Sequence, residues 1–266
     1  MQRILLTNDD GVDALGIRVL AEALLMIPDI EVYVVAPNEE KSGVGHGVTF
    51  REALSPKRHD FYGLPVQAYG INGNPADCVK AAYYLLFDKE NRPDLVLSGI
   101  NVGCNLGKDV YYSGTCSAAR EAVILGMPSV ALSYDNYHDP DSYGEAKNVI
   151  QPLLKHFIEM AKKKEMPKQV FWNVNIPDLP MSEVRGIAPA ELAFDFYQDV
   201  YHQEEAGFWL RRAYAEQIDL HGENEDFRLL KAGFITLTPV HIDSTDRDIL
   251  RQTSEWSMIR EFNRGR

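Results

Sequence analysis

Two adjacent aspartates near the start of the chain are the first residues whose types could do chemistry. Asp9 and Asp10 follow the apolar run at residues 4–6 and precede Gly11. Two carboxylates side by side repel each other, so the pair needs something that offsets its charge. A divalent cation would do this, and the absence of a histidine or cysteine cluster in the sequence around them favours Mg²⁺ or Mn²⁺ over zinc. The other interpretation is turn chemistry, with Asp10 capping the next helix.

A second group of residues suits the binding of an anion. Ser113, Gly114 and Thr115 lead directly into a predicted helix, whose first backbone N–H groups and dipole favour a phosphate. The alternative is that Ser113 or Thr115 is an ordinary helix cap. Because an acidic pair and the glycine-rich residues 98–107 accompany this turn, we predict a metal ion beside a phosphate cradle, and hence phosphoryl chemistry.

The elements that must position these residues alternate along the chain. The first 175 residues switch repeatedly between near-continuous apolar strands and helix-like segments. This pattern predicts the α/β class, with a doubly wound, mostly parallel sheet in a Rossmann-like three-layer sandwich. Ligands of such sheets bind beyond the carboxyl ends of the strands. The loops that begin near residues 8, 38, 98 and 133 follow predicted strands and should meet there.

The pattern changes after Pro180. Residues 194–217 predict a protruding β-hairpin with its turn at 205–207, followed by a strand over 233–240 and a C-terminal helix capped by Ser244 or Thr245. We therefore divide the chain into a catalytic α/β domain, 1–180, and a segment 181–266 that holds the hairpin, strand and helix. Residues 47–54 and 61–71 are expected to add two short strands.

Composition limits the partners of the protein. The 266 residues carry a net charge of -12 with a pI near 5.0, which argues against binding to a nucleic-acid polymer or to an anionic membrane. No segment approaches the roughly 20 apolar residues of a membrane span. The three cysteines have neither a CxxC nor a zinc spacing, which indicates a reduced intracellular protein. A cytoplasmic location is the expectation.

Five motifs together resemble the SurE survival-protein family of 5'/3'-nucleotidases. They are "ILLTNDDG", "VAPNEEKSGVGHGVT", "GNPADCV", "PDLVLSGINVGCNLGKDVYYSGT" and "NVNIP", and they extend from residue 4 to about residue 177. The resemblance implies a metal-dependent phosphomonoesterase, a hydrolase that converts nucleoside 5'- and 3'-monophosphates to nucleoside and phosphate. Its partner would be a small-molecule nucleotide.

The resemblance also implies roles for individual residues. One divalent cation per subunit, Mg²⁺ or Mn²⁺, would be held by Asp9, Asp10, Ser42 and Asn101. The substrate phosphate would meet Gly43, Asn105, Ser113, Gly114 and Thr115. The two aspartates are also the predicted catalytic residues. Family members form homodimers that exchange C-terminal segments, and homotetramers that pair through the hairpin, so residues 181–266 are expected to serve oligomerisation.

The sequence departs from the family pattern at three positions. Leu15 and Asn74 stand where proline and threonine are common, and neither change touches the predicted ligands. Arg247 stands where some members have a histidine, four residues after Asp243. An acid–base role of that histidine is therefore not transferred to this chain, and Asp243 remains a weak candidate.

Several alternatives stay open at this point. An aspartate could attack phosphorus directly, although the adjacent pair lacks the DxD spacing of aspartyl-phosphate phosphatases, which favours water as the nucleophile. His46 and His241 are candidates for the general acid, with a solvated loop histidine as the preferred interpretation of His46, and His138 is expected on the surface. The alternatives to a nucleotidase are a nucleotide-binding sensor without turnover and a metal-dependent nucleotide-sugar transferase.

Overall fold

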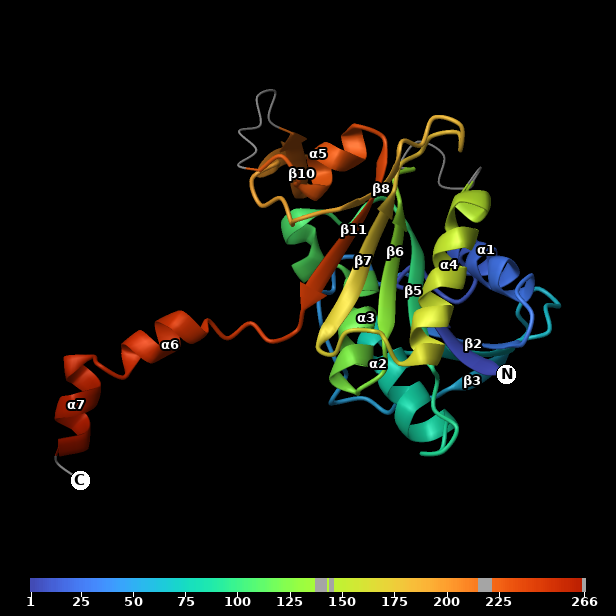
Figure 1. The fold of residues 1–266 in the computed structure, drawn as a ribbon, viewed down its shortest axis with the longest axis horizontal. Helices are drawn as coiled ribbons and strands as arrows, with labels where there is room; N and C mark the ends of the chain where they lie inside the picture. Colours follow the sequence, from blue (N-terminus) through green and yellow to red (C-terminus); the bar gives the residue numbers. More distant parts are fainter. Residues whose placement is uncertain (137–142, 144–145, 215–221, 265–266) are drawn as a thin grey trace.

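A nine-stranded sheet forms the centre of the molecule and has helices on both faces (Figure 1). The structure is a computed structural model, and it describes residues 1–136, 143, 146–214 and 222–264. The strands lie in the order β3-β4-β2-β1-β5-β6-β7-β11-β8. The six parallel strands are β1 (Gln2–Thr7), β2 (Ile30–Pro37), β4 (Gln67–Ile71), β5 (Leu95–Val102), β6 (Ser129–Tyr134) and β7 (Val170–Ile176). The predicted α/β class and doubly wound sheet are confirmed.

Three further strands complete the edges of this sheet. On one edge, β3 (Lys57–His59) runs antiparallel to β4. On the other edge, β11 (Phe234–His241) runs antiparallel to β7, and β8 (Gly186–Pro189) runs parallel to β11. Two strands from beyond residue 180 thus extend the sheet that the first part of the chain forms. The division into segments 1–180 and 181–266 stays a prediction.

Each face of the sheet is covered by its own helices. α1 (Leu15–Leu25) and α4 (Ala146–Lys163) pack on one face, whereas α2 (Pro75–Ala81), the short turn η1 (Ala82–Leu86) and α3 (Gly114–Ile124) pack on the other. Side chains alternate along a strand, so a strand buried on both faces must be apolar throughout. Ile4 and Leu6 accordingly join the core beneath α1 and α4, and Leu5 joins the core beneath α2 and α3.

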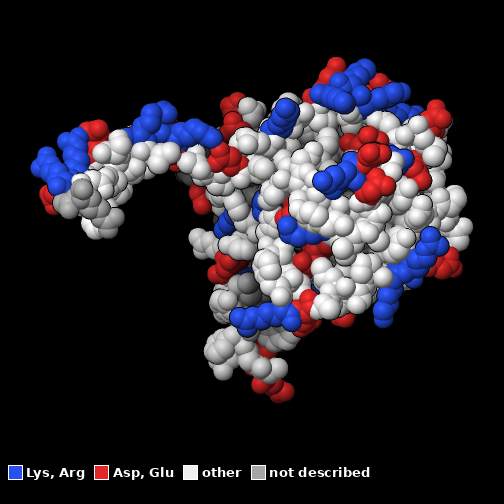
Figure 2. Space-filling model, turned by 90° about the horizontal axis from the view of Figure 1, so that it is seen from below, with Lys and Arg blue, Asp and Glu red and all other residues white. Residues whose placement is uncertain are grey.

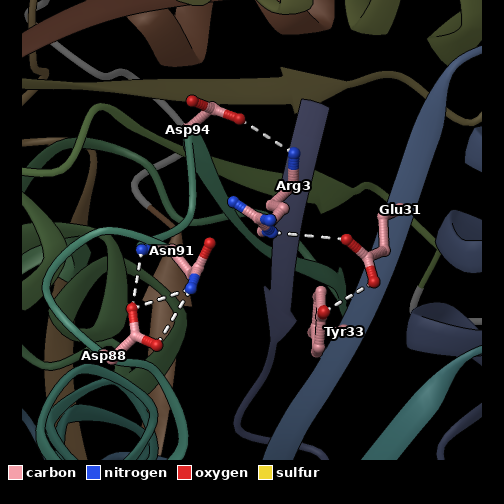
Figure 3. A network of polar contacts seen from close by, with 6 residues as sticks. All are labelled: Arg3, Glu31, Tyr33, Asp88, Asn91 and Asp94. Carbon is pink, nitrogen blue, oxygen red and sulfur yellow. Dashed lines mark hydrogen bonds and ion pairs between the residues drawn. The ribbon is translucent and has the colours of Figure 1, made fainter. Parts of the chain in front are cut away.

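A polar network fixes the amino ends of three neighbouring strands (Figure 3). The Arg3 guanidinium lies 3.3 Å from the Glu31 carboxylate, which also accepts a 2.6 Å hydrogen bond from the Tyr33 hydroxyl. The Arg3 backbone N–H donates to Asp94 at 2.9 Å. Partly exposed pairs of this kind contribute little to stability. The network lies at the end of the sheet opposite to the site described below.

The predicted hairpin is confirmed. β9 (Tyr197–Glu204) and β10 (Gly207–Tyr214) pair antiparallel around a turn at 205–206, and they form a separate two-stranded sheet. Residues 215–217, the end of the predicted hairpin, lie outside the described residues. The short helix α5 (Asp226–Lys231) follows before β11.

Two local predictions are wrong. Residues 47–54 form no strand, because Thr49 bonds to the Asp77 side chain of α2 instead of joining a ladder, and β3 takes the place beside β4. The single C-terminal helix is divided into α6 (Arg247–Thr253) and α7 (Ser257–Arg264). Its cap is Asp246, whose side chain accepts from the backbone N–H groups of residues 248 and 249, and not Ser244 or Thr245.

The two C-terminal helices extend away from the body as an arm (Figure 1). Residues 247–264 contain no buried side chain. Large apolar side chains on the arm are exposed instead, namely Ile249, Leu250, Trp256, Met258 and Phe262. In Figure 2 charged side chains line one edge of the arm and uncharged ones the other. Over the part of the chain that the structure describes, no helix has the length and apolar character that a membrane span requires.

Candidate active site

Three neighbouring strands deliver the polar residues to one edge of the sheet. β1 lies between β2 and β5, and all three run in parallel, so the loops that follow Thr7, Pro37 and Val102 lie beside one another. The pairing of β5 with β6 shifts its register between Ser98 and Asn101. Bulges of this type are common beside active sites because they redirect a side chain. Asn101 follows this irregularity.

The hydroxyl of Thr115 joins two of the predicted metal ligands. It donates a short hydrogen bond to Asp9 Oδ1 and lies 3.3 Å from Asn101 Oδ1. The Asn101 amide nitrogen donates to the carbonyls of Val102 at 3.0 Å and Gly103 at 2.8 Å, which fixes the orientation of the amide. Oxygen atoms from the loop after β1, from β5 and from α3 therefore lie close together.

The side chain of Asp9 packs against the amino end of α3. It is 4 % exposed, and a Cβ atom added to Gly114 would lie 2.6 Å from Asp9 Cβ and 2.7 Å from Asp9 Oδ2. Burial raises the pKa of Asp9, while hydrogen bonds from Thr115 and Gly114 act in the opposite direction. Ser113 is the cap of the same helix, since its hydroxyl oxygen accepts from the Cys116 backbone N–H at 3.0 Å. The capping interpretation of Ser113 is confirmed, and its contact with a phosphate stays a prediction.

Asp10 is the residue whose surroundings bear most directly on whether the cluster fits a cation. Within the described residues its buried Oδ2 atom has no hydrogen-bond partner. Burial and the charge of Asp9 raise the pKa of Asp10 from 3.8 to about 7, and Glu40 adds to this. A hydrogen bond from the Val102 backbone acts in the opposite direction. A buried carboxylate oxygen without a hydrogen bond is costly, and a bound cation would remove that cost. The helix-cap interpretation of Asp10 is wrong, because α1 begins after Ala14.

The loop after β2 brings the fourth predicted ligand to the same place. The backbone N–H of Lys41 donates to the Asp9 carbonyl at 2.7 Å, so Ser42 lies beside the acidic pair. The Ser42 side chain is exposed, and its hydroxyl donates to the Glu40 carboxylate at 2.7 Å. Gly43 is also exposed, with a φ of +68° and open space where a side chain would be.

The donor set of this cluster fits a hard cation. Among the residues that the structure describes, no three His, Cys, Asp or Glu side chains are grouped so that they could hold a metal ion. A cation at this edge of the sheet would instead use the two carboxylates together with hydroxyl and amide oxygens. Oxygen donors of this type suit Mg²⁺ or Mn²⁺.

Asn105 lies deeper than the other predicted phosphate contacts. It is 7 % exposed, its amide nitrogen donates to Ser133 Oγ at 2.9 Å, and its backbone N–H donates to Asn175 Oδ1 at 2.8 Å. Its carbonyl accepts from the Asn173 and Asn175 amides at 2.8 and 3.1 Å. The "NVNIP" motif on β7 therefore holds the loop after β5 in place.

The candidates for a general acid have different surroundings. His46 is not a solvated loop residue, because its Nε2 atom lies 2.8 Å from Oε2 of the buried Glu121. His241 pairs with Val170 at the amino end of β7, so within one chain His241 and the nearby Asp243 lie at the opposite end of the sheet. Asp243 contacts Arg247. His138 lies outside the described residues.

Sequence reasoning missed three residues that the structure places at the site. Glu40 contacts Ser42 and raises the pKa of Asp10. Tyr143 donates a 2.8 Å hydrogen bond to the Ile100 carbonyl, and burial together with the charges of Asp10 and Asp9 raises the pKa of its hydroxyl. Glu121 binds His46. Position in the predicted helix could have indicated Glu121, which follows Gly114 by seven residues and therefore lies on the same helical face.

The pKa of Asp10 gives a testable prediction for the metal-free protein. A carboxyl group whose pKa rises from 3.8 to about 7 on folding binds its proton more tightly in the folded state. Its contribution to stability is therefore present below pH 4 and is lost as the pH rises through 7. In EDTA at pH 8, we expect the free energy of unfolding of Asp10→Asn to exceed that of the wild type by about 1–3 kcal/mol. Near pH 4 the two values should be equal. Denaturant titrations at both pH values measure the difference. If the free energies of unfolding of the two proteins changed with pH in the same way, the raised pKa of Asp10 would be contradicted.

Comparisons with known proteins agree with this arrangement. A family model described as survival protein SurE matches residues 4–199. A protein of Brevibacillus brevis named 5'-nucleotidase SurE is 57% identical over 262 residues, which cover 98% of each chain. A protein of Carboxydothermus hydrogenoformans with the same name is 39% identical over 261 residues, 96% of each chain. The crystal structure of the SurE protein from Aquifex aeolicus matches with a TM-score of 0.77 and 34% identity, and covers 94% of this chain and 97% of that one.

Proposed function

This chain belongs to the SurE survival-protein family, and we propose that it hydrolyses nucleoside monophosphates at the cluster around Asp9 and Asp10. The relatives named 5'-nucleotidase match over nearly the whole chain, so the sensor and transferase alternatives are not favoured. The products are nucleoside and phosphate. The observation that carries the proposal is the buried Oδ2 atom of Asp10, which has no hydrogen-bond partner in the part of the chain that the structure describes, together with the oxygens of Asp9 and Asn101 that share the Thr115 hydroxyl.

The proposed metal site consists of Asp9, Asp10, Ser42 and Asn101, with one divalent cation, Mg²⁺ or Mn²⁺, per subunit. When bound, the cation would offset charge on the phosphate and make an attacking water more acidic. The Thr115 hydroxyl and the first backbone N–H groups of α3 keep the Asp9 carboxylate in one orientation. The raised pKa of Asp10 belongs to the protein without a cation; a bound cation would keep this carboxylate ionised, in the form that orients the attacking water.

Water is the nucleophile that we propose. Asp9 Oδ1 already accepts the Thr115 hydrogen bond, and the residue is 4 % exposed, so its own attack on phosphorus is disfavoured. A reaction with phosphorus-labelled AMP, quenched during turnover, should leave no label on the protein. Recovery of a phosphorylated aspartate would show that the covalent route operates instead.

The phosphate contacts of the proposal are Gly43, Asn105, Ser113, Gly114 and Thr115. Two of the loops that carry them are joined directly, because the Gly45 backbone N–H donates to the Tyr112 carbonyl at 2.9 Å. The loops that carry Gly43 and Ser113 therefore lie against each other. The positive end of the α3 dipole would favour a phosphate bound there.

Phosphate release from the 5'- and 3'-monophosphates of the four ribonucleosides tests the function. Each substrate is incubated with Mn²⁺, with Mg²⁺ and with EDTA. We expect release with at least one cation and none in EDTA. Release that persists in EDTA would contradict the metal site, and binding of AMP without release under every condition would return the protein to the sensor interpretation.

We further propose a cytoplasmic protein with no nucleic-acid polymer or membrane as partner. The net charge of -12 supports this, and so do Cys78, Cys104 and Cys116, which are buried and take part in no disulfide within the described residues. A secreted protein of this cysteine content would more often contain disulfides.

A homodimer or homotetramer with exchanged C-terminal segments is also part of the proposal. The arm that α6 and α7 form supports it, because its large apolar side chains are exposed. Removing residues 244–266 should convert an exchanged dimer into a monomer, whose mass in light scattering coupled to gel filtration is below the 30.0 kDa of the full chain. A monomeric full-length protein would contradict the exchange, and so would a truncated protein that carries Phe208→Asp as well and stays oligomeric. Phe208 lies on the hairpin and is 68% exposed. Phe208→Asp should convert a tetramer that pairs through the hairpin into dimers and should leave a dimer unchanged.

A further inference from the structure

The loop that carries Ser42 has no regular secondary structure, yet it is attached to the body at defined points. At its start, the Lys41 backbone N–H donates to the Asp9 carbonyl at 2.7 Å. At its end, Thr49 donates through its backbone and its hydroxyl to the Asp77 carboxylate at 2.9 and 2.7 Å. Between these two points lie Gly43 and Gly45, whose φ values of +68° and +58° favour glycine. A further attachment of this segment to the body lies between these two points.

His46 supplies that attachment through a side chain of α3. Its Nε2 atom lies 2.8 Å from Oε2 of Glu121, and the His46 side chain is 23% exposed. The adjacent Gly45 N–H bonds to the Tyr112 carbonyl, directly before the Ser113 cap. The loop is therefore fastened at His46 to the same helix whose first turn contacts Asp9.

Glu121 is a buried carboxylate shared between three elements. Its side chain is 4% exposed, and its second oxygen lies 2.7 Å from the Lys80 ammonium of α2. Burial alone would raise the pKa of Glu121, but the hydrogen bonds and charges of His46 and Lys80 outweigh burial and lower that pKa. Lys80 already offers the carboxylate a counter-charge, so His46 is not needed for charge balance. What the His46 contact adds is a fixed position of the loop relative to α3.

We infer that Glu121 and His46 are positioning residues for the nucleotidase reaction, and that their contact holds Ser42 beside the acidic pair. The inference rests on the proposed metal site. Buried ion pairs are weak stabilisers but can fix one arrangement of a structure. Loss of the contact should leave the fold intact, loosen the loop, and weaken the binding of both the cation and the substrate.

Three variants separate this role from a merely structural one. His46→Ala removes the contact, and His46→Gln keeps an N–H donor at a similar reach. Lys80→Met removes the counter-charge of Glu121 but leaves the His46 contact in place. The matched control is His59→Ala, because His59 Nε2 lies 2.7 Å from the Asp13 carboxylate in a similar pair outside the loop.

The experiment uses the full-length protein and three measurements. They are the Kd of Mn²⁺ from titration calorimetry without substrate, the KM and kcat for AMP, and amide hydrogen exchange of the peptide covering residues 38–50. For His46→Ala we expect a Kd and a KM raised by about tenfold, the scale at which supporting contacts of metal ligands act, together with faster exchange of the loop. His46→Gln should recover most of both affinities, and Lys80→Met and His59→Ala should leave the Kd and the loop exchange unchanged.

Two results would overturn the inference. One is an unchanged Kd and unchanged loop exchange in His46→Ala. The other is a lower kcat in His46→Ala with an unchanged Kd, because that result would assign His46 to the chemical step. If the wild type releases no phosphate from AMP, the proposed function fails, while the Mn²⁺ and exchange measurements still decide the positioning role.

Discussion

Asp10→Asn is expected to lower the kcat for phosphate release from AMP by about a thousandfold in the presence of Mn²⁺. The substitution keeps the size of the side chain but removes the negative charge that would hold the cation and orient the attacking water. The buried Oδ2 atom of Asp10 would become an amide nitrogen or a neutral oxygen. An amide nitrogen does not bind a hard cation, and an amide oxygen would bind it without the negative charge that offsets the charge of the cation. Steady-state phosphate release at saturating Mn²⁺ measures the effect.

The matched control for this prediction is Asp13→Asn, in the same turn. Asp13 pairs with His59, and its side chain is 69% exposed, so its loss should change kcat little. Full activity of Asp10→Asn would contradict the metal site even if Asp13→Asn behaves as expected. Thermal unfolding of both variants in EDTA shows whether a lower kcat results from a less stable fold.

Gly114→Ala is expected to lower kcat/KM by about a hundredfold while the fold is preserved. The new Cβ atom would lie 2.6 Å from Asp9 Cβ and 2.7 Å from Asp9 Oδ2, closer than real contacts allow. Either the Asp9 carboxylate or the first turn of α3 must move, and displacements of about 1 Å at a catalytic group cost activity on this scale. Alanine is otherwise favourable at a helical position. Kinetics with AMP, together with the Kd of Mn²⁺, measure the change.

Gly222→Ala provides the comparison, because a Cβ atom there meets its nearest neighbour, Glu225 Cγ, at 3.6 Å, an ordinary contact. This control should keep the kinetics of the wild type. If Gly114→Ala is fully active with an unchanged Mn²⁺ affinity, the contact between Asp9 and the amino end of α3 has no role in catalysis. Circular dichroism and melting temperature exclude a general loss of structure in either variant.

The fold could be predicted because its signals are local. A run such as residues 4–6 is apolar at every position, and the structure shows the reason, since Leu5 and its neighbours face opposite cores. The hairpin turn at 205–206 and the helix after Ser113 were likewise encoded in short segments. Position at the carboxyl ends of parallel strands then indicated which loops meet.

The errors arose where a distant contact decides the local structure. Residues 47–54 have the composition of a strand, but Thr49 is held by Asp77 of α2, 28 positions away in the chain. His46 resembled a solvated loop residue because Glu121, 75 positions away, gives no local signal of the pair. The hydrogen bond from Tyr143 to the Ile100 carbonyl likewise joins residues that are far apart in the chain, 43 positions. No spacing rule within one sequence predicts such pairs.

The most direct measurement is diffraction from crystals of the full-length protein grown with Mn²⁺, with data collected at the manganese absorption edge. We predict one anomalous peak per subunit between the carboxylates of Asp9 and Asp10, with Ser42 and Asn101 as further oxygen neighbours. A peak held by other residues would contradict the proposed site. So would the absence of any peak at the aspartate pair in protein that hydrolyses AMP.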